Sequence, residues 1–228
     1  MIYDLMPFSV ADFPGTVAAT VFISGCNFRC PYCHNSSLIK PVEGITAEGD
    51  ILGYLDTRTG LIDGVCITGG EPTLWPGLED LIIKIKSKGC KVKLDTNGAR
   101  PSVVRKLLDA GLLDYIAMDI KAPLKKYGLF VNDGADIARV EETAGIIMDC
   151  GLSYEFRTTV HEKILGADDF KDIGVWLSGA ERYALQGYKY SDGVLDKELC
   201  GTSPCDIKYL EKIKDEVTPY FDEVLVRS

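Results

Sequence analysis

Short apolar runs rich in β-branched residues alternate along this chain with segments of helical period, and this alternation limits the fold more than any other feature. The runs that predict strands are residues 17–23, 62–68, 91–96, 114–120, 154–160, 182–186 and 222–227. The segments that predict helices lie near residues 46–58, 77–88, 101–110, 135–150, 167–177 and 205–217. A strand followed by a helix, repeated about six times, is typical of an α/β fold with a parallel sheet that lies open or curls into a barrel. Six units are too few for the full eight-unit barrel.

Residues at the helix ends agree with this pattern. Thr46 is predicted to cap the first helix, and Pro101 suits the first turn of the third. Gly89, Gly111 and Gly151 each follow a predicted helix end, where glycine is common.

The composition sets bounds on size, compartment and partners. A chain of 228 residues with 46% hydrophobic content can bury one sizeable core, so we expect a single domain over residues 1–228. The apolar runs are too short to span a bilayer and the N-terminus lacks the basic start of a signal peptide, which predicts a cytoplasmic protein without a membrane partner. The eight cysteines are then expected to be reduced thiols or metal ligands. The net charge of −9 disfavours nucleic acid as a partner.

Residues with unusual chemistry come at or after the ends of the predicted strands. In chain order, these segments read GCNFRCPYCHN, GGEPT, DTNG, DIKAP, RTTVH and LQGY. The carboxyl ends of parallel strands share one rim of a sheet or barrel, and that rim holds the ligands and the chemistry in such folds. We therefore expect these segments to surround one functional site.

Cys26, Cys30 and Cys33 are spaced closely enough for one loop to wrap three corners of an iron-sulfur cluster. A 4Fe-4S cluster normally takes four thiolates, so three would leave one iron as an open Lewis-acidic position, as in catalytic zinc sites. The alternatives are a structural zinc site with His34 as fourth ligand, a disulfide, or plain buried thiols. His34 adjoins Cys33, which makes joint tetrahedral coordination awkward, and a disulfide conflicts with the expected compartment.

The same stretch resembles the signature of a known family. CNFRCPYC matches the CxxxCx(aromatic)C pattern of radical S-adenosylmethionine enzymes, with Tyr32 in the aromatic position. In that family the unique iron chelates the amino and carboxylate groups of the methionine moiety, and the aromatic residue lies beside the adenine. The resemblance therefore implies that Cys26, Cys30 and Cys33 hold a 4Fe-4S cluster and that Tyr32 contacts S-adenosylmethionine.

The segment TGGEP resembles the GGE motif of the same family, in which backbone groups and the glutamate hold the methionine ammonium. Gly69 and Gly70 carry no side chain, which would let a ligand approach the backbone, and the Glu71 carboxylate would pair with an ammonium. Taken alone, the motif is equally consistent with a tight strand-to-helix turn that exposes a glutamate.

The segments DTNG and DIK resemble motifs of the branch of the family that activates glycyl radical enzymes. The resemblance places Asp95, Thr96 and Asp119 near the bound cofactor, in some members around a monovalent cation for which their oxygens are suitable ligands. Lys121 is either a contact to the cofactor or partner, or a solvated charge at a strand end. For DTNG the alternative is a plain turn, because Asn-Gly is a strong turn signal.

Arg157 lies in FRTTV and matches an arginine that the family places after the fifth strand, near the ligand's carboxylate or ribose. A guanidinium that faces inward from a strand needs a partner, which favours a ligand role over a structural ion pair. His161 follows it, and a lone histidine is more often a loop or core residue than a functional one.

The remaining cysteines fall into two groups. Cys66, Cys90 and Cys150 lie in apolar strand or helix-end contexts and are expected to behave as small hydrophobic residues. Cys200 and Cys205 lie in a loop of glycine, serine and proline, where they form a redox pair, belong to a partial metal site, or have no function. Two thiolates alone do not complete a zinc or cluster site, which favours the last interpretation.

The order of the motifs resembles, over almost the whole chain, the activating proteins of anaerobic ribonucleoside-triphosphate reductases. The resemblance implies a partial (β/α)6 TIM-type barrel with parallel strands. It also implies that a reduced 4Fe-4S cluster cleaves the C5′–S bond of S-adenosylmethionine, and that the 5′-deoxyadenosyl radical abstracts hydrogen from a glycine Cα of a partner. That partner is a glycyl radical enzyme, and the electron donor is a flavodoxin or ferredoxin. No catalytic side chain beyond the cluster and cofactor is expected.

Two features fit an open rim that receives a macromolecular substrate. No insertion for extra clusters follows the cysteine loop, and little chain remains to enclose a small substrate. The nearer alternatives are an activase of pyruvate formate-lyase or another glycyl radical enzyme, and a small-molecule enzyme such as a 7-carboxy-7-deazaguanine synthase. The farther alternative is a non-catalytic metal-binding module with structural cysteines.

Overall fold

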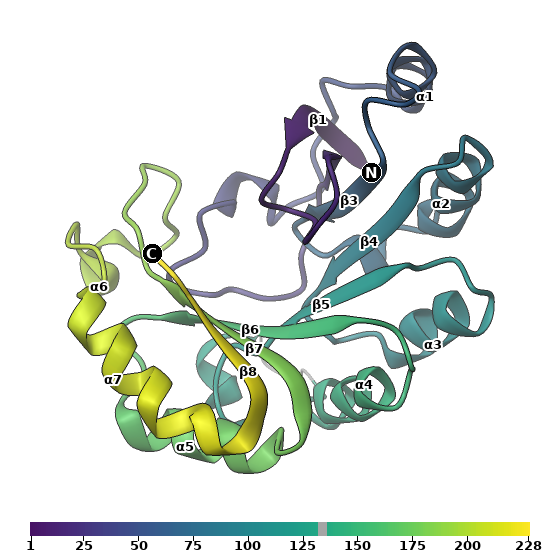
Figure 1. The fold of residues 1–228 in the computed structure, drawn as a ribbon. Coiled ribbons are helices and arrows are strands. Elements are labelled where there is room, and N and C mark those ends of the chain that lie inside the picture. Colours follow the sequence, from purple (N-terminus) through teal and green to yellow (C-terminus); the bar gives the residue numbers. More distant parts are fainter. Residues whose placement is uncertain (132–135) are drawn as a thin grey trace.

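Eight strands form one curved sheet in the computed structural model, which describes residues 1–131 and 136–228 (Figure 1). The strands pair in chain order; β1 runs antiparallel to β2, and the strands from β2 to β8 are parallel. Their bounds are Ile2–Ser9 (β1), Ala18–Ile23 (β2), Gly64–Gly69 (β3), Lys91–Thr96 (β4), Tyr115–Asp119 (β5), Tyr154–Val160 (β6), Ala180–Gly187 (β7) and Phe221–Arg227 (β8). Within these ranges the two edge strands, β1 and β8, do not pair with each other, so the barrel stays open.

Helices connect consecutive parallel strands and cover the outer face of the sheet (Figure 1). They are α1 (Glu48–Thr57), α2 (Leu78–Ser87), α3 (Pro101–Asp109), α4 (Ala138–Met148), α5 (Ala167–Trp176), α6 (Lys197–Cys200) and α7 (Ile207–Val217). Short 3-10 helices cover Ser36–Leu38 (η1), Pro72–Leu74 (η2), Leu124–Leu129 (η3) and Thr218–Tyr220 (η4). Because each connection returns along the outside, the carboxyl ends of the parallel strands meet at one rim. In the described part of the chain, no helix has the length and apolar character needed to cross a membrane.

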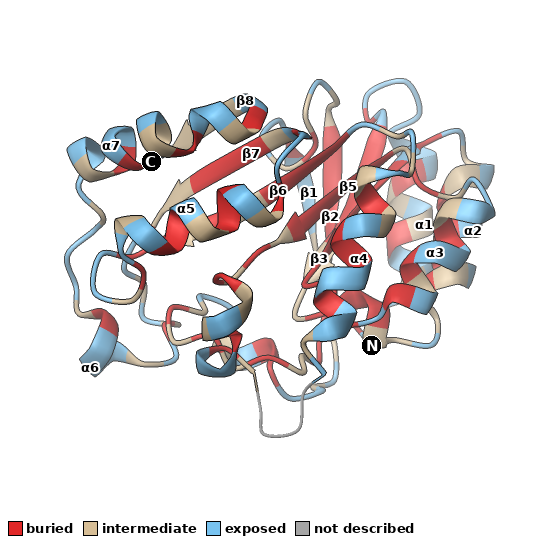
Figure 2. Cartoon of the chain, turned by 90° about the horizontal axis from the view of Figure 1, so that it is seen from below, coloured by how far each residue is buried: buried red, intermediate tan, exposed pale blue. Residues whose placement is uncertain are grey.

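The two faces of the sheet differ in polarity because side chains alternate along each strand. In β4, Val92 and Leu94 belong to the apolar core that the outer helices cover, whereas Lys93 and Asp95 point to the inner face. The buried strands lie behind helices whose outward surfaces are exposed (Figure 2). The apolar core therefore lies between sheet and helices, and charged groups occupy part of the barrel interior.

The predicted fold class is confirmed: the protein has an α/β fold with a mostly parallel, partly closed sheet. Each predicted strand and helix is present within a few residues of its expected bounds. Pro101 begins α3, and Gly89, Gly111 and Gly151 have positive φ angles after helix ends. Residue 135, the first of the predicted helix 135–150, lies outside the described residues.

The sequence analysis missed β1. This strand pairs with β2 through an irregular register, and its exposed side chains include Met6 and Phe8 while Ile2 and Ser9 are buried. An edge strand that is only partly covered lacks the continuous apolar run by which the buried parallel strands were predicted.

The predicted cap at Thr46 is wrong. Ala47 occupies the N-cap position of α1, and its backbone N–H donates to Oδ2 of Asp50 at 3.1 Å. The Thr46 hydroxyl donates instead to Oδ1 of Asp4 at 3.1 Å, which links the start of the helix to β1. The Thr46 hydroxyl therefore bonds to Asp4 on β1, a strand that was not predicted, and does not cap α1.

Candidate functional site

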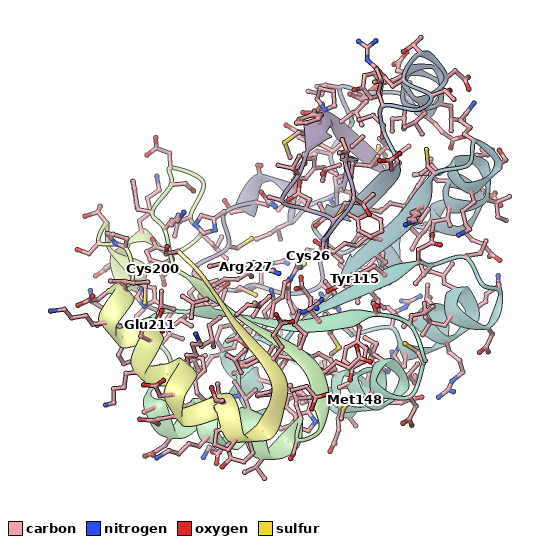
Figure 3. All side chains as sticks on the ribbon, viewed as in Figure 1. Cys26, Tyr115, Met148, Cys200, Glu211 and Arg227 are labelled. Atoms are coloured by element: carbon pink, nitrogen blue, oxygen red, sulfur yellow. The ribbon has the colours of Figure 1, made fainter. Side chains whose placement is uncertain are left out.

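A cavity of about 270 Å³ opens at the rim where the parallel strands end. Segments that follow β2 to β7 contribute to its wall, and Figure 3 places Cys26 near the middle of the molecule. All of the residues that the sequence analysis assigned to a cluster or cofactor line it: Cys26, Cys30, Tyr32, Cys33, Gly69, Gly70, Glu71, Asp95, Thr96, Asp119, Lys121 and Arg157. The structure thus brings the predicted set together in one place, and their individual roles stay predictions.

The loop that carries the three cysteines is held by backbone hydrogen bonds. The N–H groups of Gly25 and Cys26 donate to the carbonyls of Leu38 and Ile39, at 2.7 and 2.9 Å. Within the loop, the Cys33 N–H donates to a carbonyl one turn earlier at 3.0 Å. The segment that follows β2 therefore forms a closed loop, because Leu38 and Ile39 lie beside Gly25 and Cys26.

The three thiols are free and all contribute to the cavity wall. Cys30 is buried, and Cys26 and Cys33 are half-buried. Burial raises the pKa of the Cys26 thiol to about 11 and that of Cys30 to about 12, and it also raises the pKa of Cys33. Without a metal these thiols stay protonated near neutral pH, so metal binding would release their protons.

Tyr32 lies between two of these cysteines and packs against Phe130, with ring centroids 5.6 Å apart. Its side chain is buried, and among the described residues its hydroxyl has no hydrogen-bond partner. A buried hydroxyl left without a partner costs about 1–3 kcal/mol. Tyr32 thus contributes to the cavity wall, and its predicted contact with a cofactor stays a prediction.

The end of β2 and the start of the cysteine loop occupy the space that side chains at Gly69 and Gly70 would need. A Cβ on Gly69 would collide with the backbone of Ile23, and one on Gly70 with the carbonyl oxygen of Gly25. The same backbones are bonded, since the N–H groups of Gly70 and Glu71 donate to Ile23 and Gly25, both at 2.8 Å. The glycines thus make room for the loop, and their predicted contact with a cofactor stays a prediction.

Replacing Gly70 by alanine should push the cysteine loop away from the end of β3. We expect a loss of about 1–3 kcal/mol of stability from the steric clash, and at least a twofold loss of iron per protein after anaerobic reconstitution. Gly49→Ala is the matched control, because a Cβ at this exposed position of α1 meets nothing within 4 Å. Full iron content in Gly70→Ala would contradict this account of the glycine pair.

The buried carboxylate of Glu71 ties the end of β3 to the end of β4. Its Oε1 accepts from the backbone and hydroxyl of Thr73 and from the Thr96 hydroxyl at 2.8 Å, and its Oε2 accepts from the Asn97 N–H at 2.6 Å. Burial raises the pKa of Glu71, although these hydrogen bonds act in the opposite direction. Glu71 therefore holds two rim segments in place, and its predicted pairing with an ammonium stays a prediction.

Five charged side chains form a chain of ion pairs across the inner face of β4, β5 and β6. Arg157 donates from Nη1 to Oδ2 of Asp95 at 3.1 Å and from Nε to Oδ1 of Asp119 at 2.9 Å. Lys93 pairs with Oδ1 of Asp95, and Lys121 with Oδ2 of Asp119 at 3.1 Å. We call these five residues the charge ladder. It has three cations and two anions, so one positive charge is left unbalanced.

Asp95, Asp119, Lys121 and Arg157 are ionised near neutral pH. Burial opposes the charged form of Asp95 and Asp119, but the adjacent cations outweigh it and lower the pKa of both carboxyl groups. Burial likewise opposes the charged forms of Arg157 and Lys121, and the carboxylates hold their pKa values well above the ordinary range. Asp95, Asp119, Lys121 and Arg157 line the cavity, so two positive and two negative charges of the charge ladder face it.

The sequence analysis missed Lys93. Its side chain is fully buried, contacts Asp95 and lies 3.7 Å from the Cys66 sulfur. The signal was present, because Lys93 and Asp95 are two positions apart on one strand and therefore share a face. Cys66 is buried, in keeping with the small core residue that was expected.

The geometry gives no support to a monovalent cation at Asp95, Thr96 and Asp119. Every carboxylate oxygen of the two aspartates is already paired with a lysine or with Arg157. The Thr96 hydroxyl donates to Glu71. A cation bound here would have to displace Lys93, Lys121 or Arg157 from these carboxylates.

The imidazole of His34 is engaged with residues outside the cysteine loop. Its Nε2 contacts the Lys189 carbonyl, and its ring stacks on Tyr188 with centroids 5.8 Å apart. Across residues 1–131 and 136–228, no group of three or more histidine, cysteine, aspartate or glutamate side chains is arranged to hold a single metal ion. The alternative of a zinc ion held by His34 and the thiols therefore has no geometric support.

Cys200 and Cys205 lie apart from this cavity. They line a smaller one of about 140 Å³ together with His161, and both thiols are free. Nε2 of His161 contacts the Cys200 carbonyl at 3.0 Å, so the imidazole is engaged with backbone. Figure 3 shows Cys200 on α6, well separated from Cys26.

Comparison with protein families gives one match that includes most of this cavity. The model of the Radical SAM superfamily matches residues 20–168, a range that contains the cysteine loop, Glu71 and the charge ladder.

Three named relatives differ in how much of the chain they cover. A Methanocaldococcus jannaschii protein with the provisional name glycyl-radical enzyme activating enzyme is 32% identical over 239 residues, covering 100% of this chain and 96% of the relative. A 7-carboxy-7-deazaguanine synthase of Neisseria meningitidis is 31% identical over 60% of this chain and 59% of its own. A pyruvate formate-lyase-activating enzyme of Staphylococcus aureus is 33% identical over 42% of this chain and 41% of its own.

Among solved structures, Streptococcus suis SuiB bound to S-adenosylmethionine has a similar fold. The TM-score is 0.68 at 16% identity, and the match covers 90% of this chain and 49% of SuiB. The chain thus spans about half the length of that protein. This likeness supports the open α/β barrel as the fold.

Proposed function

The chain belongs to the Radical SAM superfamily, and on this premise we propose that it is an activating enzyme that uses a 4Fe-4S cluster and S-adenosylmethionine to generate a glycyl radical on a partner enzyme. The observation that carries the proposal is the cavity whose lining includes three free thiols and four members of the charge ladder, Asp95, Asp119, Lys121 and Arg157. The full-length match to the Methanocaldococcus jannaschii relative supports the activating role.

The residues present fit both cofactors in chemical type. Three thiols from one loop suit a cluster that keeps an iron free of cysteine. The cations Arg157 and Lys121 suit the carboxylate of an amino acid moiety, and Tyr32 contributes to the same cavity wall. When bound, the two cofactors supply one-electron cleavage of the C5′–S bond and an oxidant that removes hydrogen from a glycine Cα.

The protein's own residues bind and orient. Cys26, Cys30 and Cys33 would ligate iron from a loop whose backbone is already fixed. Arg157 and Lys121 would attract the cofactor carboxylate, while Asp95 and Asp119 keep both cations ionised and in place. The burial of Tyr32 and Glu71 keeps water from that part of the wall. In this proposal no side chain transfers a proton.

The finer parts of the proposal rest on the resemblance of the motifs. The order of motifs along residues 1–228 supports one radical S-adenosylmethionine domain and an anaerobic ribonucleoside-triphosphate reductase as partner. A flavodoxin or ferredoxin is the proposed electron donor. We do not include the monovalent cation, because the oxygens that would bind it are paired within the charge ladder.

The decisive experiment uses the full chain after anaerobic iron-sulfur reconstitution and reduction. Electron paramagnetic resonance should show a cluster signal that changes on addition of S-adenosylmethionine, and 5′-deoxyadenosine should form. Addition of the cognate reductase should then give a glycyl radical signal. A protein that cleaves the cofactor but leaves the reductase without radical would refute the partner, and a protein that binds no cluster would refute the whole proposal.

A second candidate follows from the relatives named 7-carboxy-7-deazaguanine synthase, which match about half or more of the chain. It places the substrate inside the cavity instead of on a partner enzyme. The same reconstituted protein, supplied with the substrate of that synthase, distinguishes the two functions through formation of 7-carboxy-7-deazaguanine.

A further inference from the structure

Asn97 occupies a position that the motif comparison leaves unassigned. It follows β4, is buried, and contributes to the cavity wall. Its backbone N–H donates to Oε2 of Glu71 at 2.6 Å, and its side-chain Oδ1 accepts from the Ala99 N–H at 3.0 Å. The bond from Ala99 to Oδ1 fixes the orientation of the Asn97 amide, so its nitrogen points away from Ala99.

That nitrogen faces the cysteine loop. Nδ2 of Asn97 donates to Oδ1 of Asn27 at 2.9 Å and lies 4.0 Å from the sulfur of Cys26. The backbone N–H of Phe28 donates to the same sulfur at 3.4 Å. The Cys26 sulfur therefore has two N–H groups near it. One belongs to Phe28 in its own loop, and the other belongs to Asn97 at the end of β4.

We propose that Asn97 is a positioning residue for the cluster: it orients the Cys26 end of the loop through Asn27 and stabilises negative charge on the Cys26 sulfur. This inference rests on the proposed function, because it needs an iron-sulfur cluster at the three cysteines. Hydrogen bonds to cluster sulfurs are among the factors that set the reduction potential. An N–H donor favours the more negative, reduced state, so Asn97 makes the cluster easier to reduce.

A series of hydrogen bonds links Asn97 to the end of β3 and to the start of the cysteine loop. Glu71 receives the Asn97 N–H, and the Glu71 N–H donates to Gly25, immediately before Cys26. Asn97 is therefore connected to the Cys26 end of the loop in two ways: through Glu71 and the Gly25 carbonyl, and through its own side-chain amide and Asn27. Such a closed circuit restricts the movement of the Cys26 sulfur relative to the rim.

The test compares the cluster midpoint potential in Asn97→Asp, Asn97→Ala and the unaltered protein. In Asn97→Asp one oxygen can still accept from Ala99, while the other replaces the N–H donor with a negative charge. We expect about tenfold less reduced cluster at a fixed potential, which for one electron corresponds to about 59 mV. Asn97→Ala should shift the potential in the same direction by less, since it removes the donor without adding charge.

Ser87→Ala is the control, because Ser87 is an exposed residue of α2 outside the cavity, whose hydroxyl donates to the Lys84 carbonyl at 2.7 Å. Its cluster potential should not change. Equal potentials in the Asn97 variants and the unaltered protein would overturn this inference alone, as would an equal shift in Ser87→Ala. Absence of any cluster in the unaltered protein would overturn the proposed function as well. Should Asn97→Asp fail to fold, Asn97→Ala carries the test.

Discussion

Replacing Cys30 by alanine should abolish stable cluster binding and cleavage of S-adenosylmethionine. Cys30 is the most buried of the three loop thiols, and a methyl group cannot ligate iron. Loss of even an indirect partner of a metal ligand typically lowers affinity or activity by about 10–100-fold, so loss of a ligand should exceed about 100-fold. Iron per protein, the absorbance of the cluster and the rate of 5′-deoxyadenosine formation measure the effect.

Cys150→Ala is the control for this prediction. Cys150 is another free thiol, half-buried where Cys30 is buried, and it follows α4 and lies outside the cavity wall. Its replacement should leave iron content and cleavage unchanged. If Cys30→Ala kept a complete cluster and normal cleavage, the assignment of three cysteine ligands would be wrong.

Replacing Arg157 by leucine should destabilise the folded protein by about 3–5 kcal/mol, the range for removing one partner of a buried ion pair. The guanidinium contacts Asp95 and Asp119 at once, with a side-chain exposure of 12%. Leucine leaves both carboxylates without this partner in a place poorly accessible to water. Arg157→Lys should be less harmful, because it keeps the charge but cannot reach both aspartates with the same geometry. Urea unfolding of the metal-free protein at neutral pH measures both losses.

The pH dependence of that loss provides a check on its cause. The pKa values of Asp95 and Asp119 are lowered in the folded state, so their ion pairs stabilise it fully above the unfolded-state pKa of about 3.9. This stabilisation declines as the pH falls below that value and is lost as the pH falls through the lower folded-state pKa values. The difference between Arg157→Leu and the unaltered protein should therefore shrink at acid pH. A difference that is the same at pH 7 and at pH 3 would point to lost packing instead of lost charge pairing.

The parallel strands and the cavity residues were predictable from sequence because both depend on simple periodicities. Buried parallel strands give continuous apolar runs, and the polar residues at their carboxyl ends must meet once the strands are parallel. What the sequence could not give depends on contacts between distant segments. The backbone of Gly25 leaves no space for a side chain at Gly70. Thr46 does not cap α1 because its hydroxyl bonds to Asp4 on a strand that was not predicted.

Lys93 and Asn97 show the same limit within the site. The partner of Lys93 is two positions along its own strand, so its pairing was readable in principle, whereas the partners of the Asn97 amide are some seventy positions earlier. The turn signal of Asn-Gly accounts for the bond from Ala99 to Asn97, and that local explanation concealed the second contact. Asn97 therefore both forms the predicted turn and contacts the cysteine loop.

The backbone hydrogen bonds around the cysteine loop tie it to the sheet. Gly25 and Cys26 are bonded to residues beyond the loop, and the ends of β2 and β3 are bonded to each other. These bonds use main-chain groups alone, so they do not depend on which side chains the loop carries. The course of the loop should therefore tolerate a change of side chain at any of its three cysteines, so that the chemistry of the loop can be altered by mutation separately from its shape.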